Sequence, residues 1–249
     1  MATAQKGLLA VLVSILLLTA CVGSRNVTGY RPQLLNISGY TATDSAIVAI
    51  IAPYHAQLST QMSRVIGESA KEMAREKVES ALGNFVADLF LQEASQTFHI
   101  SADASLLTIG GLRAPLPKGK ITVGDIFELS PFENEMVLLS INGKILQQIL
   151  DILATDQKAA VGNIRFIIQN QRAVNITVNG FPLEEQQTYQ IITYDYLANG
   201  GDKLSPLIEA EKRQNLGITV RDLIIRHIER LQQEGKKIDA NLDGRVQIR

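Results

Sequence analysis

The sequence has few of the residues on which most catalytic and metal centres depend. It contains one cysteine and three histidines in 249 residues. A single cysteine excludes an internal disulfide and a cysteine-based zinc site. His55, His99 and His227 lie far apart, and none belongs to an HxH, HExxH or DxH motif. We therefore predict no metal ligands and no cofactor in this chain, and we interpret the histidines as unrelated structural or surface residues.

An excess of charge of either sign is also absent. The chain has 24 basic and 25 acidic residues, a formal net charge of −1. This balance argues against a nucleic-acid surface, so we expect no nucleic-acid partner. No serine lies in a GxSxG elbow, so we assign no catalytic residue. Hydrophobic residues make up 46% of the chain, enough for a substantial core.

The N-terminus has the pattern of a secretory signal. Residues 1–6 carry one positive charge, residues 7–17 are almost wholly apolar, and Leu-Thr-Ala-Cys follows at 18–21. A charged start, a short apolar run and a small-residue cleavage site predict a signal peptide. The apolar run is too short to span a membrane. Because the lone Cys21 directly follows the small residues of this cleavage site, the four residues 18–21 are similar to a bacterial lipobox. An ordinary signal peptide that happens to contain a cysteine is the alternative.

These features predict three parts of the chain. Residues 1–20 form a lipoprotein signal peptide, residues 21–40 form the lipidated Cys21 and a tether, and residues 41–249 form one domain with its core at 80–249. Attachment to the membrane would then be by acyl chains at Cys21. Val22 stands where an inner-membrane retention aspartate would follow the cysteine. We therefore expect a bacterial cell-envelope location, on the outer membrane.

Hydrophobic periodicity, capping residues and glycine turns alternate irregularly along the domain. This mixture predicts an α+β (mixed α/β) fold, a single domain of mixed sheets flanked by helices. The expected elements are helices at 43–62 (broken near Pro53), 80–96, 122–127, 144–154 and from 219, and strands at 104–109, 135–141, 164–168, 174–178, 189–194 and 245–248. Asn142-Gly143 predicts a turn, and the Asp-x-Asn-x-Asp-Gly run at 239–244 is interpreted as a turn before the last strand.

Three segments have the residues of a ligand site. Gly110, Gly111 and Arg113 put an arginine beside a flexible turn, where it can bind phosphate or carboxylate. The run Pro-Phe-Glu-Asn at 131–134 offers an aromatic ring and an amide. The run at 194–202 ends in two glycines and an aspartate, which can present a carboxylate to hydroxyl groups. Taken singly, each segment is a weak signal: the first is more typical of an ordinary turn, the second of a core phenylalanine, and the third has the alternative of a turn capped by Asp202.

Read in order, these segments resemble the C-terminal domain of the 5'-nucleotidase family. The landmarks are LGNFVAD at 82–88, GGLR at 110–113, ITVGDIF at 121–127, PFEN at 131–134, VNG at 178–180 and LANGGD at 197–202. Two loops depart from the family pattern. Thr108 and Ile109 replace an asparagine and a glycine, and Lys203-Leu204 replaces a glycine-tyrosine pair.

The resemblance implies roles for seven residues. Phe132 and Tyr196 would sandwich a nucleobase, with Tyr196 where the family usually has phenylalanine. Asn134 would contact the base, and Asp202 would accept ribose hydroxyls. Arg113 would reach toward the phosphate beside Gly110 and Gly111.

The resemblance also implies that catalysis takes place elsewhere. Family enzymes cleave phosphate esters with two metals in a separate N-terminal domain, whose DxH and GNHE-type motifs this sequence lacks. We therefore expect a nucleotide-recognition half of a split 5'-nucleotidase, not catalytic alone, acting with a separate metallophosphatase that carries divalent metals. The alternatives are a stand-alone nucleotide- or nucleoside-binding lipoprotein and an envelope protein whose site has decayed.

Overall fold

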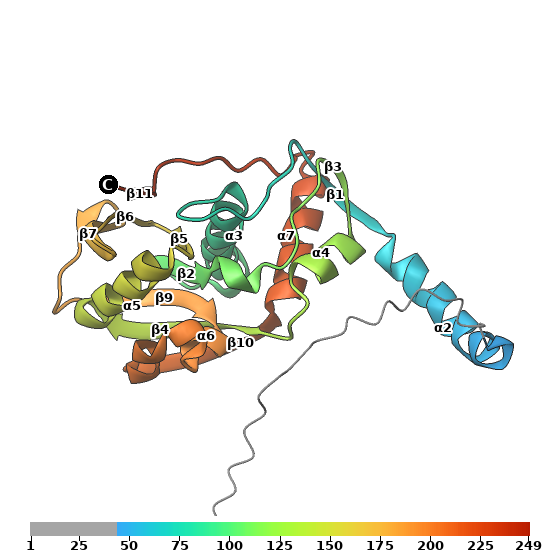
Figure 1. Ribbon diagram of the computed structural model, residues 1–249, viewed down its shortest axis with the longest axis horizontal. Helices are drawn as coiled ribbons and strands as arrows, with labels where there is room; N and C mark the ends of the chain where they lie inside the picture. Colours follow the sequence, from blue (N-terminus) through green and yellow to red (C-terminus); the bar gives the residue numbers. More distant parts are fainter. Residues whose placement is uncertain (1–43) are drawn as a thin grey trace, which may run out of the picture. The chain divides into compact units, whose positions relative to one another are not determined.

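The computed structural model describes residues 44–249 (Figure 1). The predicted signal peptide, the lipidation site at Cys21 and the tether lie outside these residues. One compact unit spans Ala49–Arg249. Across residues 44–249 no helix is long and apolar enough to cross a membrane.

The first described helix corrects one expectation. α2 (Ser45–Met62) is a single helix that contains Pro53 in its interior, although we expected a break there. A proline removes one backbone hydrogen bond, but a helix can continue past it with a local distortion. None of the α2 side chains is fully buried, and only Met62 at its C-terminal end packs against the core, so packing constrains that end of the helix alone.

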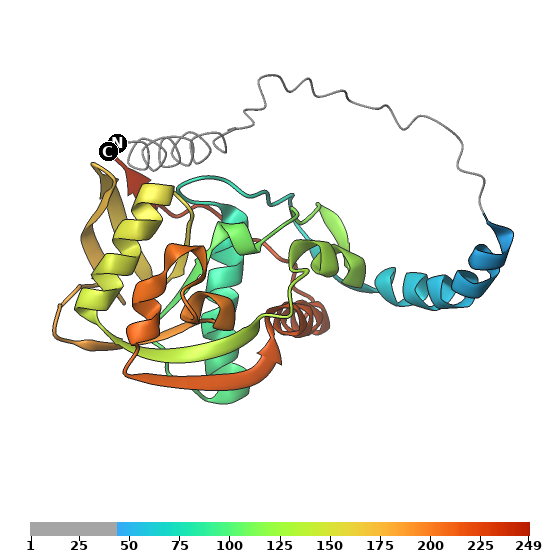
Figure 2. The same ribbon diagram turned by 60° about the horizontal axis from the view of Figure 1, so that its bottom comes forward.

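The remaining chain forms three sheets linked by helices (Figures 1 and 2). A pair β1–β3 consists of Val65–Ser69 and Gly119–Thr122. The central sheet has the order β10-β4-β9-β2-β5, formed by Lys212–Thr219, Glu135–Asn142, Thr188–Tyr194, Ala104–Thr108 and Ala159–Gly162. The third sheet has the order β11-β6-β7-β8, formed by Val246–Ile248, Ile164–Gln169, Arg172–Val178 and Phe181–Pro182.

Four further helices of seven residues or more pack around these sheets in the described chain. They are α3 (Ala81–Phe98), α4 (Val123–Leu129), α5 (Gly143–Asp156) and α7 (Val220–Gln233). Short turns of helix, η1 (Ile109–Gly111), α6 (Asp195–Ala198), η2 (Gly201–Lys203) and η3 (Ser205–Glu209), follow the strands β2 and β9. This arrangement of helices and mixed sheets confirms the predicted α+β class.

N-capping side chains explain where several of the helices begin. The Thr122 hydroxyl accepts the Asp125 backbone N–H at 3.2 Å, and the Asp125 carboxylate accepts the Thr122 N–H at 2.6 Å. This reciprocal capping box satisfies two free donors at the start of α4. The expected turn at Asn142-Gly143 is instead a direct junction, because the Asn142 side chain ends β4 and caps α5. A Cβ on Gly143 would lie 2.0 Å from the Glu184 carbonyl oxygen, so only glycine fits there.

The centre of the hydrophobic core lies around β2. All five of its residues are buried, which requires cover on both faces of the sheet. On one face Ser105 donates a hydrogen bond to the Ala87 carbonyl of α3 at 2.7 Å. Because side chains alternate along a strand, Leu106 points to the opposite face, where it is also fully buried. The first predicted site residues, Gly110 and Gly111, follow directly after this buried strand, in η1.

Candidate functional site

All seven predicted ligand-site residues line one cavity of about 240 Å³. An eighth residue, Tyr194, was not among them. The lining consists of Gly110, Gly111, Arg113, Phe132, Asn134, Tyr194, Tyr196 and Asp202.

The sheet topology explains why segments distant in sequence meet there. β2 and β9 pair in parallel, so their carboxyl ends lie at the same edge of the sheet. β4 pairs with β9 in the antiparallel sense, with Met136 opposite Tyr194, so the start of β4 lies at that edge too. The segments after β2, before β4 and after β9 therefore converge. Ligands commonly bind at such strand ends, where loops meet above a rigid sheet.

Asp202 is the polar centre of the cavity. Its Oδ2 accepts a hydrogen bond from the Thr108 hydroxyl at 2.5 Å, and its Oδ1 accepts one from the Tyr196 hydroxyl at 3.2 Å. Asp202 has a left-handed backbone with φ 51°, and Gly200 before it has φ 87°. Asn, Asp and especially Gly tolerate this conformation. The loop thus turns tightly enough to return the carboxylate toward β2, where Thr108 holds it.

Two tyrosines form an aromatic wall beside Asp202. The Tyr194 and Tyr196 rings lie nearly parallel, at 11°, with centroids 6.5 Å apart. A Cβ on Gly201 would lie 2.5 Å from the Tyr196 ring, and one on Gly111 would lie 2.6 Å from the Tyr194 hydroxyl. The two glycines therefore let the backbone approach the rings closely, which fixes the position of both rings.

Tyr194 is the lining residue that sequence reasoning missed. It is buried, and its hydroxyl lies 3.4 Å from Thr108 Oγ1. Burial raises the pKa of the Tyr194 phenol well above its usual value, with the Asp202 charge adding to the effect and the Thr108 hydrogen bond opposing it. The phenol therefore stays protonated as a donor. Its position two residues before Tyr196, at the end of a strand, was the available clue.

The segment that carries Phe132 and Asn134 is held by α7. The Val220 N–H donates to the Asn134 carbonyl at 2.8 Å. Arg221, which is buried, forms an ion pair with Glu133 and donates to the Pro131 carbonyl at 3.5 Å. Its guanidinium also lies 4.1 Å from the centre of the Phe127 ring. Arg221 lies outside the cavity, so it supports the segment without lining the site.

The loop after β2 carries the two sequence departures and Arg113. Ile109 is buried, and its carbonyl accepts the Leu112 N–H at 3.3 Å, so the substituted residue anchors a compact turn. The Arg113 N–H donates to the Leu129 carbonyl at 2.7 Å. Its exposed guanidinium donates to the Gly110 carbonyl at 3.2 Å. The arginine thus stays beside the cavity with most of its donors free for an anion.

Aromatic faces, an amide, a carboxylate and an arginine together match the chemistry of a nucleotide. Rings stack on a base, an amide pairs with a base edge, a carboxylate accepts hydroxyls, and an arginine binds phosphate. Within residues 44–249 no three His, Cys, Asp or Glu side chains cluster so as to hold a metal ion. The buried His227 is paired with Glu93, 2.8 Å away.

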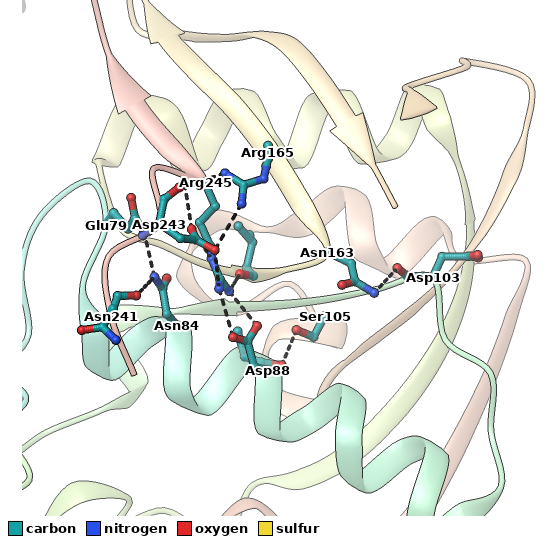
Figure 3. Close-up of polar contacts among 12 residues, drawn as sticks. Glu79, Asn84, Asp88, Asp103, Ser105, Asn163, Arg165, Asn241, Asp243 and Arg245 are labelled. Carbon is teal, nitrogen blue, oxygen red and sulfur yellow. Dashed lines mark hydrogen bonds and ion pairs between the residues drawn. The ribbon is translucent and has the colours of Figure 1, made fainter. Parts of the chain in front are cut away.

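A larger cleft of about 730 Å³ lies between α3 and the β6–β7 hairpin, but its charged groups are already paired (Figure 3). All three guanidinium nitrogens of Arg245 donate hydrogen bonds. It donates to Asp88 at 2.7 and 3.0 Å, to Asp243 at 3.0 Å twice, and to the Val161 carbonyl at 2.8 Å (Figure 3). The Arg245 hydrogen bonds lower the pKa of the Asp243 carboxyl. The run at 239–244 is an irregular segment that bends at Gly244 before β11, and the carboxylate of its Asp243 accepts hydrogen bonds from Arg245.

Comparison with known proteins gives a consistent result. The family model described as "5'-nucleotidase, C-terminal domain" matches residues 63–209. The trifunctional nucleotide phosphoesterase protein YfkN of Bacillus subtilis is 26% identical over 195 residues, 72% of this chain and 13% of that protein. Protein UshA of Yersinia enterocolitica is 25% identical over 196 residues, 76% of this chain and 35% of that protein.

A solved structure has the same fold. The 5'-nucleotidase precursor from Thermus thermophilus matches with a TM-score of 0.70 and 28% identity, covering 82% of this chain and 42% of that one. This chain therefore spans less than half the length of each of these three proteins.

Proposed function

The chain belongs to the family of 5'-nucleotidase C-terminal domains, and from this premise we propose that its cavity holds the nucleoside part of a nucleotide. One observation supports this most: the residues that the resemblance assigns to ligand binding, drawn from three separate segments, line a single cavity. Phe132 and Tyr196 stack on the base, Asn134 pairs with its edge, and Arg113 binds the phosphate.

We further propose that the chain is the recognition half of a split 5'-nucleotidase. Hydrolysis then requires a separate metallophosphatase, which carries the divalent metals and docks so that the phosphate beside Arg113 meets its metal centre. The match of residues 63–209 to a 5'-nucleotidase C-terminal domain supports a nucleotidase-related role for the recognition half. The alternative proposal is a stand-alone nucleotide- or nucleoside-binding lipoprotein with no hydrolase partner.

We propose that the protein acts at the bacterial cell envelope, anchored to the outer membrane through lipid at Cys21. The signal-like residues 1–20 and the run at 18–21 support this location. Mass spectrometry of the purified protein tests it. A mature N-terminus at Cys21 with attached acyl chains is the expected result, and an unmodified Cys21 within an intact N-terminus would contradict it.

Binding is the first property to test. Titration calorimetry with AMP is expected to show a single site. Because stacking on a base contributes about 1–3 kcal/mol, Phe132→Ala should weaken binding about fivefold or more. Phe181→Ala is the matched control, since Phe181 is the most exposed phenylalanine of the described chain, at 75%, and lies outside the cavity. Equal effects of the two variants, or no binding of AMP by the wild type, would contradict the proposed site.

A hydrolysis assay then distinguishes the split enzyme from the stand-alone binding protein. Phosphate release from AMP and UDP-glucose is measured with manganese or zinc present, first with the chain alone and then with a separately expressed metallophosphatase half. The split-enzyme proposal expects no release by the chain alone and metal-dependent release after the addition. Release by the repurified chain alone that falls with Phe132→Ala would refute it. Binding without release in either mixture would favour the stand-alone binding protein.

A further inference from the structure

Helix α2 has an apolar stripe along one side that the rest of the described chain leaves uncovered. Five large side chains form the stripe, each between 51% and 68% exposed: Ile47, Ile50, Ile51, Tyr54 and Leu58. Because they recur every three or four residues, they fall within about 120° of the helix circumference. Within residues 44–249 only Met62 of α2 packs against the core. An exposed apolar surface of this kind is typical of an interaction site.

The composition of α2 indicates which kind of partner fits the stripe. None of its 18 residues is Asp, Glu, Lys or Arg. A helix that lies on a membrane surface typically carries lysine and arginine on its polar face, which α2 does not have. Among the described residues no helix is long and apolar enough to cross a membrane. A surface without charges that includes a tyrosine is instead typical of the centre of a protein–protein interface.

The spacing of the stripe fits another helix. Four of its side chains are separated by four, three and four residues, which is the spacing of the a and d positions where two helices pack together: Ile47, Ile51, Tyr54 and Leu58. Pro53 then takes a c position, on a different side of the helix from this seam. The e and g positions beside the seam hold no charged residue, so two copies of α2 bring no like charges together.

We propose that α2 is a dimerisation helix, whose stripe packs against the same stripe of a second copy of this chain about a two-fold axis. A stripe without charges is complementary to itself, and two-fold pairs are the commonest closed oligomers. The helix is about 27 Å long, so the seam covers only about two heptads. Because sustained coiled coils extend over more heptads, this dimer should be weak and should dissociate on dilution. Attachment of both copies to one membrane would favour the pair by raising their effective concentration.

Sedimentation velocity of the purified full chain, over a wide range of protein concentration, tests the proposal. The wild type should change from monomer to dimer as its concentration rises. Ile51→Asp places a charge in the seam of each copy, so it should weaken dimerisation by about tenfold or more. Ala56→Asp is the matched control, because it adds the same charge on the opposite side of the same helix, and it should dimerise as the wild type does. Circular dichroism verifies that both variants are folded.

Three results would overturn the proposal. The first is a wild-type chain that stays monomeric at every concentration, including one that instead binds phosphatidylcholine vesicles as a monomer. The second is equal dimerisation of Ile51→Asp and the wild type. The third is an equal loss of dimer in Ile51→Asp and Ala56→Asp, since the added charge and not the stripe would then explain it. The nucleoside site lies outside α2, so titration with AMP tests it separately from all three.

Discussion

Replacement of Arg245 by lysine should destabilise the protein strongly, because the arginine joins three parts of the chain. Its guanidinium donates five hydrogen bonds: two to Asp88 on α3, two to Asp243 in the C-terminal segment, and one to the Val161 carbonyl on β5. The Arg245 side chain is only 10% exposed. Hydrogen bonds to these carboxylates raise the Arg245 pKa above its usual value despite burial, so the group is charged under all ordinary conditions.

The expected loss in free energy of unfolding for Arg245→Lys follows from the number of hydrogen-bond donors that the replacement removes. A lysine ammonium is a compact charge that can serve about two of the five acceptor sites, so about three bonds are lost. Asp88 and Asp243 are 41% and 39% exposed, which places each bond at the lower end of the usual range, about 1 kcal/mol. The expected loss in free energy of unfolding is therefore about 3 kcal/mol. For a domain of this size that lowers Tm by about 6–12 °C.

Thermal unfolding followed by circular dichroism measures this loss, with Arg165→Lys as the control. Arg165 binds the same Asp243 but is 54% exposed, so its replacement should cost less than about 1 kcal/mol. A Tm for Arg245→Lys within about 2 °C of the Arg165→Lys value would refute the reasoning. It would mean that the C-terminal segment contributes its stability through β11 alone.

Two further predictions concern groups behind the site. Arg221→Lys should weaken AMP binding although Arg221 does not line the cavity, because the segment 131–134 loses the support of the Arg221 guanidinium. Arg226→Lys, at an exposed position on the same helix, is the control in titration calorimetry, and equal AMP affinities of the two variants would contradict the prediction. Burial opposes ionisation of Glu93, but hydrogen bonds from His227, Arg230 and Thr97 outweigh it and lower the Glu93 pKa from 4.5 to about 2. Since the folded pKa is the lower one, this stabilisation, about 3 kcal/mol, is present above about pH 4.5 and decreases as pH falls toward 2. The difference in urea-unfolding free energy between wild type and Glu93→Gln should shrink by about 2 kcal/mol from pH 7 to pH 3, and a constant difference would count against it.

Apolar spacing and capping residues correctly predicted the helices and strands that have such a pattern within their own sequence. The apolar spacing of α3 and the capping residues Thr122 and Thr219 predicted helices that the structure contains. The strands β3, β5, β8 and β10 were missed. β10 has seven residues that are exposed or only partly buried, so it has no apolar run to reveal it. Its place in the sheet is set by pairing with β4, a long-range contact that no local pattern encodes.

The residues of the candidate site also fall into those that local motifs predicted and those that depend on long-range contacts. Motifs in order along the chain identified the residues that line the cavity, since their chemistry is visible in each segment. The supporting residue Arg221 and the lining residue Tyr194 were missed. The role of Arg221 depends on the contact of α7 with the segment before β4, and that of Tyr194 on the pairing of β9 with β2. Thr108 is one of the two residues at which the loop after β2 departs from the family pattern, and the sequence predicted no role for it. The structure instead gives Thr108 a polar role, as the donor to Asp202 Oδ2.

The supports of the cavity all belong to the same compact unit. The Asn134 carbonyl is held by Val220 and Asp202 by Thr108. The start of β4 is tied to α6 because Asp195 accepts hydrogen bonds from both the Glu135 and Tyr196 backbone N–H groups, at 3.1 and 2.7 Å. A site whose walls are fixed by bonds within one unit is preorganised, so little ordering opposes ligand binding. Preorganisation is the physical condition that the proposed recognition half would need in order to bind a nucleoside before the proposed partner docks. It also makes AMP affinity, rather than turnover, the property on which substitutions around Asp202 should first be judged.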